Sequence, residues 1–271
     1  MPRPANPQQL LPPFHLSVVT TTDPVTGQLS RLLAALQVFA EYRQYRIEAV
    51  IVDDLKLWSE APALPASPCL RCVPIRYAGQ RGQLQAALTG IRQASAPLVL
   101  TLDPDMHTCV DDLPDMLETL AQGHALVHGV RTHRSGLSPL RRFGSRCINV
   151  IMRYLGRLPI DDIQSPVALF YRDFFDQHAP AASQCRNPRL AYYALAGSAL
   201  ASHSLKGSAT AEGVSQYRFG MLLRLFFDLL GDAIVVRRFT RQPHGYHSNT
   251  QIRHEQNNNR SALPPPHARQ P

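Results

Sequence analysis

The stretch LVLTLDPDM, residues 98–106, decides how this chain folds, because an apolar run ends there abruptly in two acids. The run is typical of a buried strand, and Asp103 and Asp105 follow it one residue apart. On an extended strand such side chains point to the same face, so both can meet one divalent cation or one cluster of hydrogen-bond donors. The spacing therefore predicts a site for a metal ion and a diphosphate. The alternative for Asp103 is a turn or helix-cap role, since Asp-Pro is a common turn pair.

A second short apolar run, AVIVDDLK at 49–56, also ends in acids, Asp53 and Asp54. In open α/β sheets, ligands bind outside the carboxyl ends of the strands. Two strands that end in acids therefore predict one ligand crevice.

The order of apolar patterns predicts strands alternating with helices, and so a largely parallel, doubly wound sheet. Ser30 is the expected cap of the first helix and Gly123 the expected end of the third. We expect one α/β domain over 14–242, a Pro-rich flexible segment over 1–13 and a disordered polar tail over 243–271. The expected strands are 14–22, 49–54, 98–103 and 124–131, with a short one near 74, and the expected helices are 30–43, 82–95 and 111–123.

The net charge of +8 comes almost entirely from arginine. Seven arginines and no acid lie between Arg131 and Arg157. Arginine forks match phosphate oxygens, so this segment is expected to contact a nucleotide, an acceptor phosphate or an anionic lipid surface. A solvated basic face is the alternative. The chain has no recognised nucleic-acid-binding module, and we expect no nucleic-acid partner.

Apolar runs and cysteines bear on the compartment. No apolar segment reaches the roughly 18 residues of a membrane span, and the N-terminal residues lack the apolar core of a secretory leader. Cys69 and Cys72 have no second pair at zinc-finger spacing, so the five cysteines are expected to be thiols of a reducing compartment rather than zinc ligands. These features favour a cytoplasmic location.

Six motifs, in this order, resemble those of family 2 glycosyltransferases of the GT-A fold, nearest to the branch that loads a sugar onto dolichyl or undecaprenyl phosphate. The resemblance covers roughly residues 15–240. The GT-A fold has a Rossmann-like, mostly parallel sheet flanked by helices. The motifs are SVVTTT (17–22), VIVDD (50–54), GQLQAALTG (82–90), LTLDPDM (100–106), GVRTHR (129–134) and GVSQYRF (213–219).

The resemblance implies a role for each matching residue. Asp103 and Asp105 would bind Mg²⁺ or Mn²⁺ and the donor diphosphate, with Arg131 near the phosphates and Asp162 as a further catalytic acid. A cation and a guanidinium stabilise the charge that develops on a departing nucleoside diphosphate. The residues implied to hold the nucleotide are Thr20, Asp53, Asp54, Gln83 and Asp103, and those implied to hold the acceptor phosphate are Arg134, Arg141, Ser215 and Arg218.

The resemblance also implies partners: a nucleotide-diphosphate sugar as donor and a lipid phosphate as acceptor. Segments 140–156 and 218–231 have apolar stripes, and the first also has an adjacent row of arginines, as in helices that lie in a bilayer interface. We expect peripheral association with the cytoplasmic face of the membrane, directly or through a membrane partner protein. Ordinary packing of both helices on the sheet is the alternative.

A second hypothesis comes from a departure from the family pattern. The branch has Gly-Glu-Ser-Lys where this chain has Gly213-Val214-Ser215-Gln216, without the acid and the lysine. The alternative function is therefore a catalytically impaired GT-A protein that binds a nucleotide, a lipid or a partner.

Overall fold

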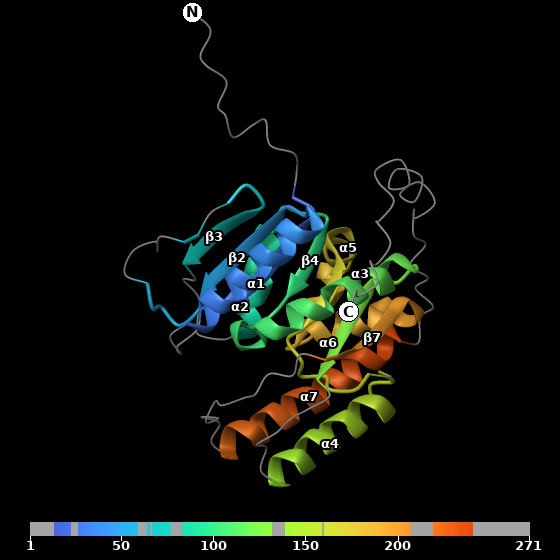
Figure 1. Cartoon of the computed structure of the whole chain (residues 1–271). Coiled ribbons are helices and arrows are strands. Elements are labelled where there is room, and N and C mark those ends of the chain that lie inside the picture. The colour runs from blue at the N-terminus through green and yellow to red at the C-terminus, as the bar shows by residue number, and fades with distance from the viewer. Residues whose placement is uncertain are drawn as a thin grey trace, which may run out of the picture.

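The chain forms one seven-stranded sheet flanked by helices (Figure 1). The structure is a computed structural model. It describes residues 14–22, 27–58, 64–65, 67–76, 83–131, 139–158, 160–206 and 219–240, with the backbone alone at 139–145, 147 and 219–226. The segments expected to be flexible, 1–13 and 243–271, lie outside the described residues, so the proposed domain limits stay predictions.

The sheet has the strand order β3-β2-β1-β4-β6-β5-β7. Every neighbouring pair is parallel except the two that involve β6, which is antiparallel to β4 and to β5. The mostly parallel α/β sheet predicted from the sequence is thereby confirmed. The strands are β1 Leu16–Thr21, β2 Ile47–Asp53, β3 Leu70–Arg76, β4 Leu98–Thr101, β5 Leu126–Arg131, β6 Ala168–Tyr171 and β7 Leu200–Leu205.

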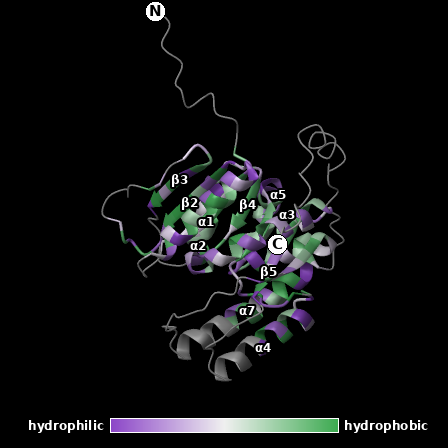
Figure 2. Ribbon diagram, viewed as in Figure 1, coloured by the Kyte–Doolittle hydropathy of each residue, from purple (hydrophilic) through white to green (hydrophobic). Residues whose placement is uncertain are grey.

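Helices cover both faces of the sheet, and alternate strand residues point into two separate cores. In β1, Val18 contributes to the core under α1, η2 and α3, whereas Val19 contributes to the core under α2, α5 and α6. Figure 2 shows the strands as the apolar centre between these layers. The helices are α1 Gln28–Arg43, α2 Gln83–Gln93, η2 Pro104–Asp112, α3 Leu113–Ala121, α4 Pro139–Tyr154, α5 Arg172–Ala182, α6 Pro188–Ala196, η3 Gly197–Ala199 and α7 Phe219–Phe239.

Two local predictions were wrong. Ser30 does not cap α1, because the helix begins at Gln28 and Gly27 takes the capping position with a left-handed φ of 102°. The strand before Asp103 is also shorter than expected. It ends at Thr101, so Asp103 lies at the N-cap of the 3₁₀ helix η2 and Asp105 lies in its first turn. The two acids are held by a helix start rather than by a strand, as the turn alternative for Asp103 anticipated.

Helices α4 and α7 pack side by side and project from one end of the sheet (Figure 1). Asp232 anchors α7 to the body, because its carboxylate accepts hydrogen bonds from the backbone N–H groups of Arg186 and Asn187, both at 2.8 Å. Met152 of α4 is buried in the core. Within the part of the chain that the structure describes, neither these nor the other helices are long and apolar enough to cross a membrane.

Candidate active site

The carboxyl ends of the parallel strands meet at one edge of the sheet, and most of the candidate residues lie there. β1, β2, β4 and β5 all end at this edge. Because β6 runs in the opposite direction, the loop before it returns to the same edge and brings Asp162 and Ser165 with it. The candidate residues at this edge therefore come from three kinds of segment: strand ends, helix starts and one return loop.

Asp53 at the end of β2 organises the loop that follows it. One carboxylate oxygen accepts a hydrogen bond from Thr22 Oγ1 at 3.1 Å and one from Leu57 N at 2.9 Å, and the other accepts one from Trp58 N at 2.9 Å. The side chain is buried, so these bonds offset the cost of removing its charge from water. Asp53 thus fixes the backbone next to Asp54, which is also buried.

Asp103 and Asp105 place two negative charges at the start of η2. Gln83, in the first turn of α2, donates from Nε2 to Asp103 Oδ2 at 2.8 Å. Burial, together with the charge of Asp105, raises the pKa of Asp103 to about 7, although Arg189, Arg131 and the Gln83 hydrogen bond act to lower it. A further positive charge beside Asp103 would therefore stabilise its ionised form.

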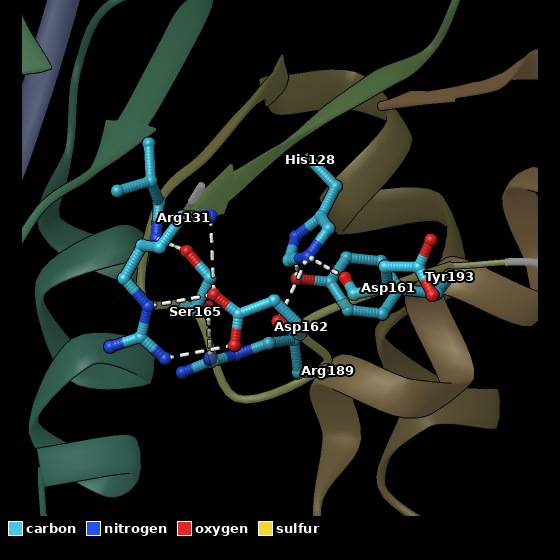
Figure 3. Close-up of polar contacts among 8 residues, drawn as sticks. His128, Arg131, Asp161, Asp162, Ser165, Arg189 and Tyr193 are labelled. Atoms are coloured by element: carbon cyan, nitrogen blue, oxygen red, sulfur yellow. Dashed lines mark hydrogen bonds and ion pairs between the residues drawn. The ribbon is translucent and has the colours of Figure 1, made fainter. Parts of the chain in front are cut away.

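Arg131 and Asp162 form a two-pronged ion pair at the end of β5 (Figure 3). Arg131 donates from Nε to Asp162 Oδ2 at 2.7 Å and from Nη2 to Oδ1 at 2.9 Å. The backbone N–H of Arg131 also donates to Oδ2, at 3.2 Å. Asp162 is therefore committed to holding Arg131, and this geometry suits a positioning residue better than a proton acceptor.

His128 contacts the backbone of Asp161 and Asp162. Its Nε2 lies 3.1 Å from the carbonyl oxygen of Asp161 and 3.2 Å from that of Asp162, and its Nδ1 lies 3.0 Å from the hydroxyl of Tyr193. Carbonyl oxygens only accept, so the proton sits on Nε2 and Tyr193 donates to Nδ1. Burial lowers the pKa of His128 to about 4, which keeps the ring neutral. Figure 3 shows this chain of contacts running from α6 to Arg131.

Arg189 of α6 approaches the same loop from the other side. Its Nη1 donates to the carbonyl oxygen of Ser165 at 2.7 Å, and the backbone N–H of Ser165 donates to the carbonyl oxygen of Asp162 at 2.8 Å. The segment from Asp162 to Ser165 thus contacts Arg131 through a side chain and Arg189 through the backbone.

The donor set at Asp103 and Asp105 fits a hard divalent cation. The charge of Asp105 raises the pKa of Asp103, and a divalent cation beside the two carboxylates would offset this repulsion. Among the described residues no group of three or more His, Cys, Asp or Glu side chains converges as a complete metal cage. Mg²⁺ is commonly bound through one or two carboxylates, such as Asp103 and Asp105, and takes its other ligands from water and substrate phosphates.

The structure brings most, but not all, of the predicted residues to this edge. Thr20 is buried further back in β1, and the hydroxyl that reaches Asp53 belongs to Thr22. Arg134, Ser215 and Arg218 lie outside the described residues, as does the side chain of Arg141.

Sequence analysis did not identify Thr22, His128, Ser165, Arg189 or Tyr193. Of these five residues, only Arg189 has a sequence context that could have indicated a function. It follows Asn187-Pro188, a pattern typical of a helix start, where the helix dipole disfavours a positive charge. A cation in this position invites a functional explanation. The other four are polar residues within apolar or loop segments, and only the fold shows what they contact.

Comparison with known proteins identifies the family of this chain. The model of the family described as "Glycosyl transferase family 2" matches residues 24–178. An undecaprenyl-phosphate 4-deoxy-4-formamido-L-arabinose transferase of Pseudomonas savastanoi pv. phaseolicola is 27% identical over 231 residues, which are 80% of this chain and 66% of the relative. The enzyme of the same name from Shewanella sediminis is 27% identical over 209 residues, 74% of this chain and 60% of the relative. The chain thus spans at most about two thirds of the length of these relatives.

Solved structures give the fold. Glucosyl-3-phosphoglycerate synthase from Mycobacterium tuberculosis, in complex with Mn²⁺, UDP and phosphoglyceric acid, superposes with a TM-score of 0.54 at 12% identity, over 81% of this chain and 78% of that one. The same enzyme in complex with phosphoglyceric acid alone also gives 0.54. At this identity the likeness supports the GT-A architecture and nothing finer. Since the family match extends over more than half of the 271 residues, this chain belongs to glycosyl transferase family 2.

Proposed function

We propose that this protein transfers a sugar from a nucleotide-diphosphate sugar to a polyprenyl phosphate, with a divalent cation and with inversion at the anomeric carbon. One observation carries the proposal. Asp103, Gln83 and Arg131 converge at the carboxyl edge of a family 2 domain, with two carboxylates on η2 suited to a cation. The names of the relatives supply the acceptor class, because both act on undecaprenyl phosphate according to those names.

On the donor side, we assign the residues by their contacts. The loop that Asp53 orders, with Asp54, would hold the nucleoside, as expected from the resemblance. Gln83 orients Asp103 toward the diphosphate, and Asp162 holds the guanidinium of Arg131 at the same edge. Because these donors are fixed before substrate binds, they stabilise the charge that develops on the leaving diphosphate without reorganisation.

The acceptor needs little acid–base help. A phosphate monoester is ionised at neutral pH, so one of its oxygens attacks the anomeric carbon directly. The bond from that carbon to the donor phosphate breaks, and the electron pair leaves with the nucleoside diphosphate. No proton has to move, which agrees with an Asp162 carboxylate that is already bound to Arg131. A bound Mg²⁺ or Mn²⁺ would act as a Lewis acid on the diphosphate, held by Asp103 and Asp105.

We also propose that α4 and α7 contact the membrane surface on the cytoplasmic face. Four large apolar side chains on this helix pair are more than half exposed: Val150, Tyr154, Phe227 and Ile234. Arg146 is exposed on the same pair. Apolar side chains next to arginines are typical of helices that lie at the head-group level of anionic membranes.

The proposal is tested by nucleotide binding and by transfer. The purified protein is titrated with UDP, CDP and GDP, with and without Mn²⁺, and binding is followed by thermal shift, because a ligand of the native state raises its apparent stability. We expect a Mn²⁺-dependent shift with one nucleotide and its loss in Asp105→Asn. Transfer is then measured from the matching nucleotide sugar to a polyprenyl phosphate.

Asp111→Asn is the matched control, because Asp111 lies in the same 3₁₀ helix and is exposed. Its binding should equal that of the wild type. Equal binding by Asp105→Asn would remove the metal assignment. Nucleotide or lipid binding without transfer to any acceptor would support the alternative, a binding module without activity.

A further inference from the structure

Arg189 occupies an unfavourable position for a cation. It follows Pro188 in the first turn of α6, where the N-terminal end of the helix dipole is positive. It is also partly buried, which adds a desolvation cost. Nothing in the helix itself compensates for this, since the first turn of α6 holds no acid. A negative charge from outside the helix would offset both costs.

Contacts with the loop before β6 hold the Arg189 side chain. Arg189 Nη1 donates a hydrogen bond to the Ser165 carbonyl, and the backbone N–H of Ser165 donates one to the carbonyl oxygen of Asp162. In the view of Figure 3 the Arg189 side chain runs past the Asp162 carboxylate toward the guanidinium of Arg131. The charges of both arginines lower the pKa of Asp103, so both lie near that carboxylate.

The two arginines differ in how their charges are balanced. Arg131 has a carboxylate partner, Asp162, at 2.7 Å. Arg189 forms no ion pair with any acid of the described residues, and its one hydrogen bond there goes to a neutral carbonyl. Arg189 therefore lies near Asp103 without a carboxylate partner of its own among the described residues.

We propose that Arg189 is a phosphate-binding residue of this site, held ready by the Ser165 carbonyl. The proposal rests on the proposed function and deepens it. The ligand is a phosphate oxygen, because guanidinium donors at a fixed position match phosphate geometry and the helix N-terminus that disfavours the arginine also favours an anion. That oxygen belongs either to the donor diphosphate or to the acceptor phosphate, and the experiment separates the two sources.

The experiment uses Arg189→Gln, Arg189→Lys and the control Arg186→Gln. Arg186 lies three residues earlier, is exposed and pairs with Asp228 at the surface, so its variant removes the same charge outside the site. Two probes are titrated by calorimetry: inorganic pyrophosphate with and without Mn²⁺ for the donor side, and farnesyl phosphate for the acceptor side. Urea unfolding of each variant reports whether the loop before β6 is still supported.

We expect Arg189→Gln to weaken the binding of one probe about tenfold, as for the loss of one charge-assisted hydrogen bond. Arg189→Lys should recover part of the loss, and Arg186→Gln should bind as the wild type. Weaker pyrophosphate binding assigns Arg189 to the donor, and weaker farnesyl phosphate binding assigns it to the acceptor. Unchanged affinity for both probes overturns the inference, and in that case Arg189 only supports the loop.

The two proposals fail in different ways. A wild-type protein that binds pyrophosphate through Arg189 but transfers no sugar keeps the phosphate site and rejects the transferase. Transfer that is unchanged in Arg189→Gln, with unchanged affinities, keeps the transferase and rejects the phosphate site. A wild type that binds neither probe nor any nucleotide rejects both.

Discussion

At the residue scale, Asp162 combines a strained backbone with a committed side chain. Its φ of 49° lies in the left-handed region, and its carboxylate accepts three hydrogen bonds from Arg131. A left-handed aspartate persists only where the surroundings hold it, and here His128 and Ser165 contact its carbonyl oxygen. The residue that positions Arg131 is therefore itself positioned by its neighbours.

Asp162→Asn tests this arrangement. Asparagine tolerates the same backbone, so the change removes the charge and leaves Arg131 without its counter-ion. We expect the free energy of unfolding to fall by about 2–3 kcal/mol, below the cost of breaking a fully buried pair because Arg131 is partly exposed. Asp161→Asn is the control. Its pair with Arg153 is at the surface and should contribute at most about 1 kcal/mol. Equal losses in urea unfolding would contradict the assignment.

His128 predicts a pH dependence of stability. Below pH 6.5 the unfolded chain binds a proton at this ring, whereas the folded protein does so only near pH 4. The unfolded state thus binds more protons in this window, so stability contributed by His128 is complete above pH 6.5 and is lost as the pH falls toward 4. The full loss is about 3 kcal/mol.

The measurement compares urea unfolding of the wild type and His128→Gln between pH 4 and 7. Other groups titrate in this range in both proteins, so the difference between their slopes reports His128 alone. The variant is expected to be less stable at neutral pH but to lose less stability on acidification. Parallel curves would mean that His128 is not held neutral.

At the scale of elements, α2 lies so close to the sheet that one of its positions has no room for a side chain. A Cβ added at Gly90 would lie 2.5 Å from Val19 Cγ1 and 3.0 Å from Val52 Cγ2. Both valines are buried in the strands β1 and β2, so an added methyl group would have to displace tightly packed side chains. The close approach also fixes α2, whose first turn presents Gln83 to Asp103.

Gly90→Ala should therefore destabilise the protein even though alanine favours a helix. Overpacking costs about 1–3 kcal/mol and the gain in helix propensity is up to about 1 kcal/mol, so we expect a net loss near 1 kcal/mol. Gly231→Ala in α7 is the control, because nothing lies within 4 Å of its added Cβ. That variant should gain about 0.5–1 kcal/mol. Thermal unfolding that raises the melting temperature of both variants would show that α2 can move away from the sheet.

The elements also show what the sequence was able to predict. Periodic apolar residues predicted the helices α1 and α2, and apolar runs predicted the strands β1, β2 and β4, because each of these elements is buried along a repeating face. The direction of β6 carries no local signal, since strand orientation depends on which neighbours a strand joins. For that reason Asp162 was selected from the family resemblance, while Ser165 and its contact with Arg189 were not. The start of η2 was predicted only as the alternative for Asp103, because Asp103-Pro104 also fits a strand end followed by a turn.

At the scale of the whole molecule, the α4–α7 pair is set apart from the sheet and carries exposed apolar side chains. We predict that Val150→Ser with Tyr154→Ser weakens cosedimentation with vesicles of phosphatidylethanolamine and phosphatidylglycerol. Losing buried apolar area lowers membrane affinity by roughly 25 cal/mol per Å². Val38→Ser with Tyr42→Ser is the matched control. These residues of α1 are at least as exposed as Val150 and Tyr154, but they lie on a helix that packs against the sheet. Equal loss in both pairs would reduce α4 to an ordinary packing helix.

The antiparallel strand β6 separates two sets of proposed site residues. Strands β1 to β4 and their helices supply the residues proposed for the nucleotide, whereas the return loop before β6 and the start of α6 supply those that hold Arg131 and Arg189. The β4–β6 pairing joins the two groups within one sheet. Substitutions in the return loop can therefore change how Arg131 and Arg189 are held, and with them phosphate recognition, while the residues proposed for the nucleoside stay unchanged.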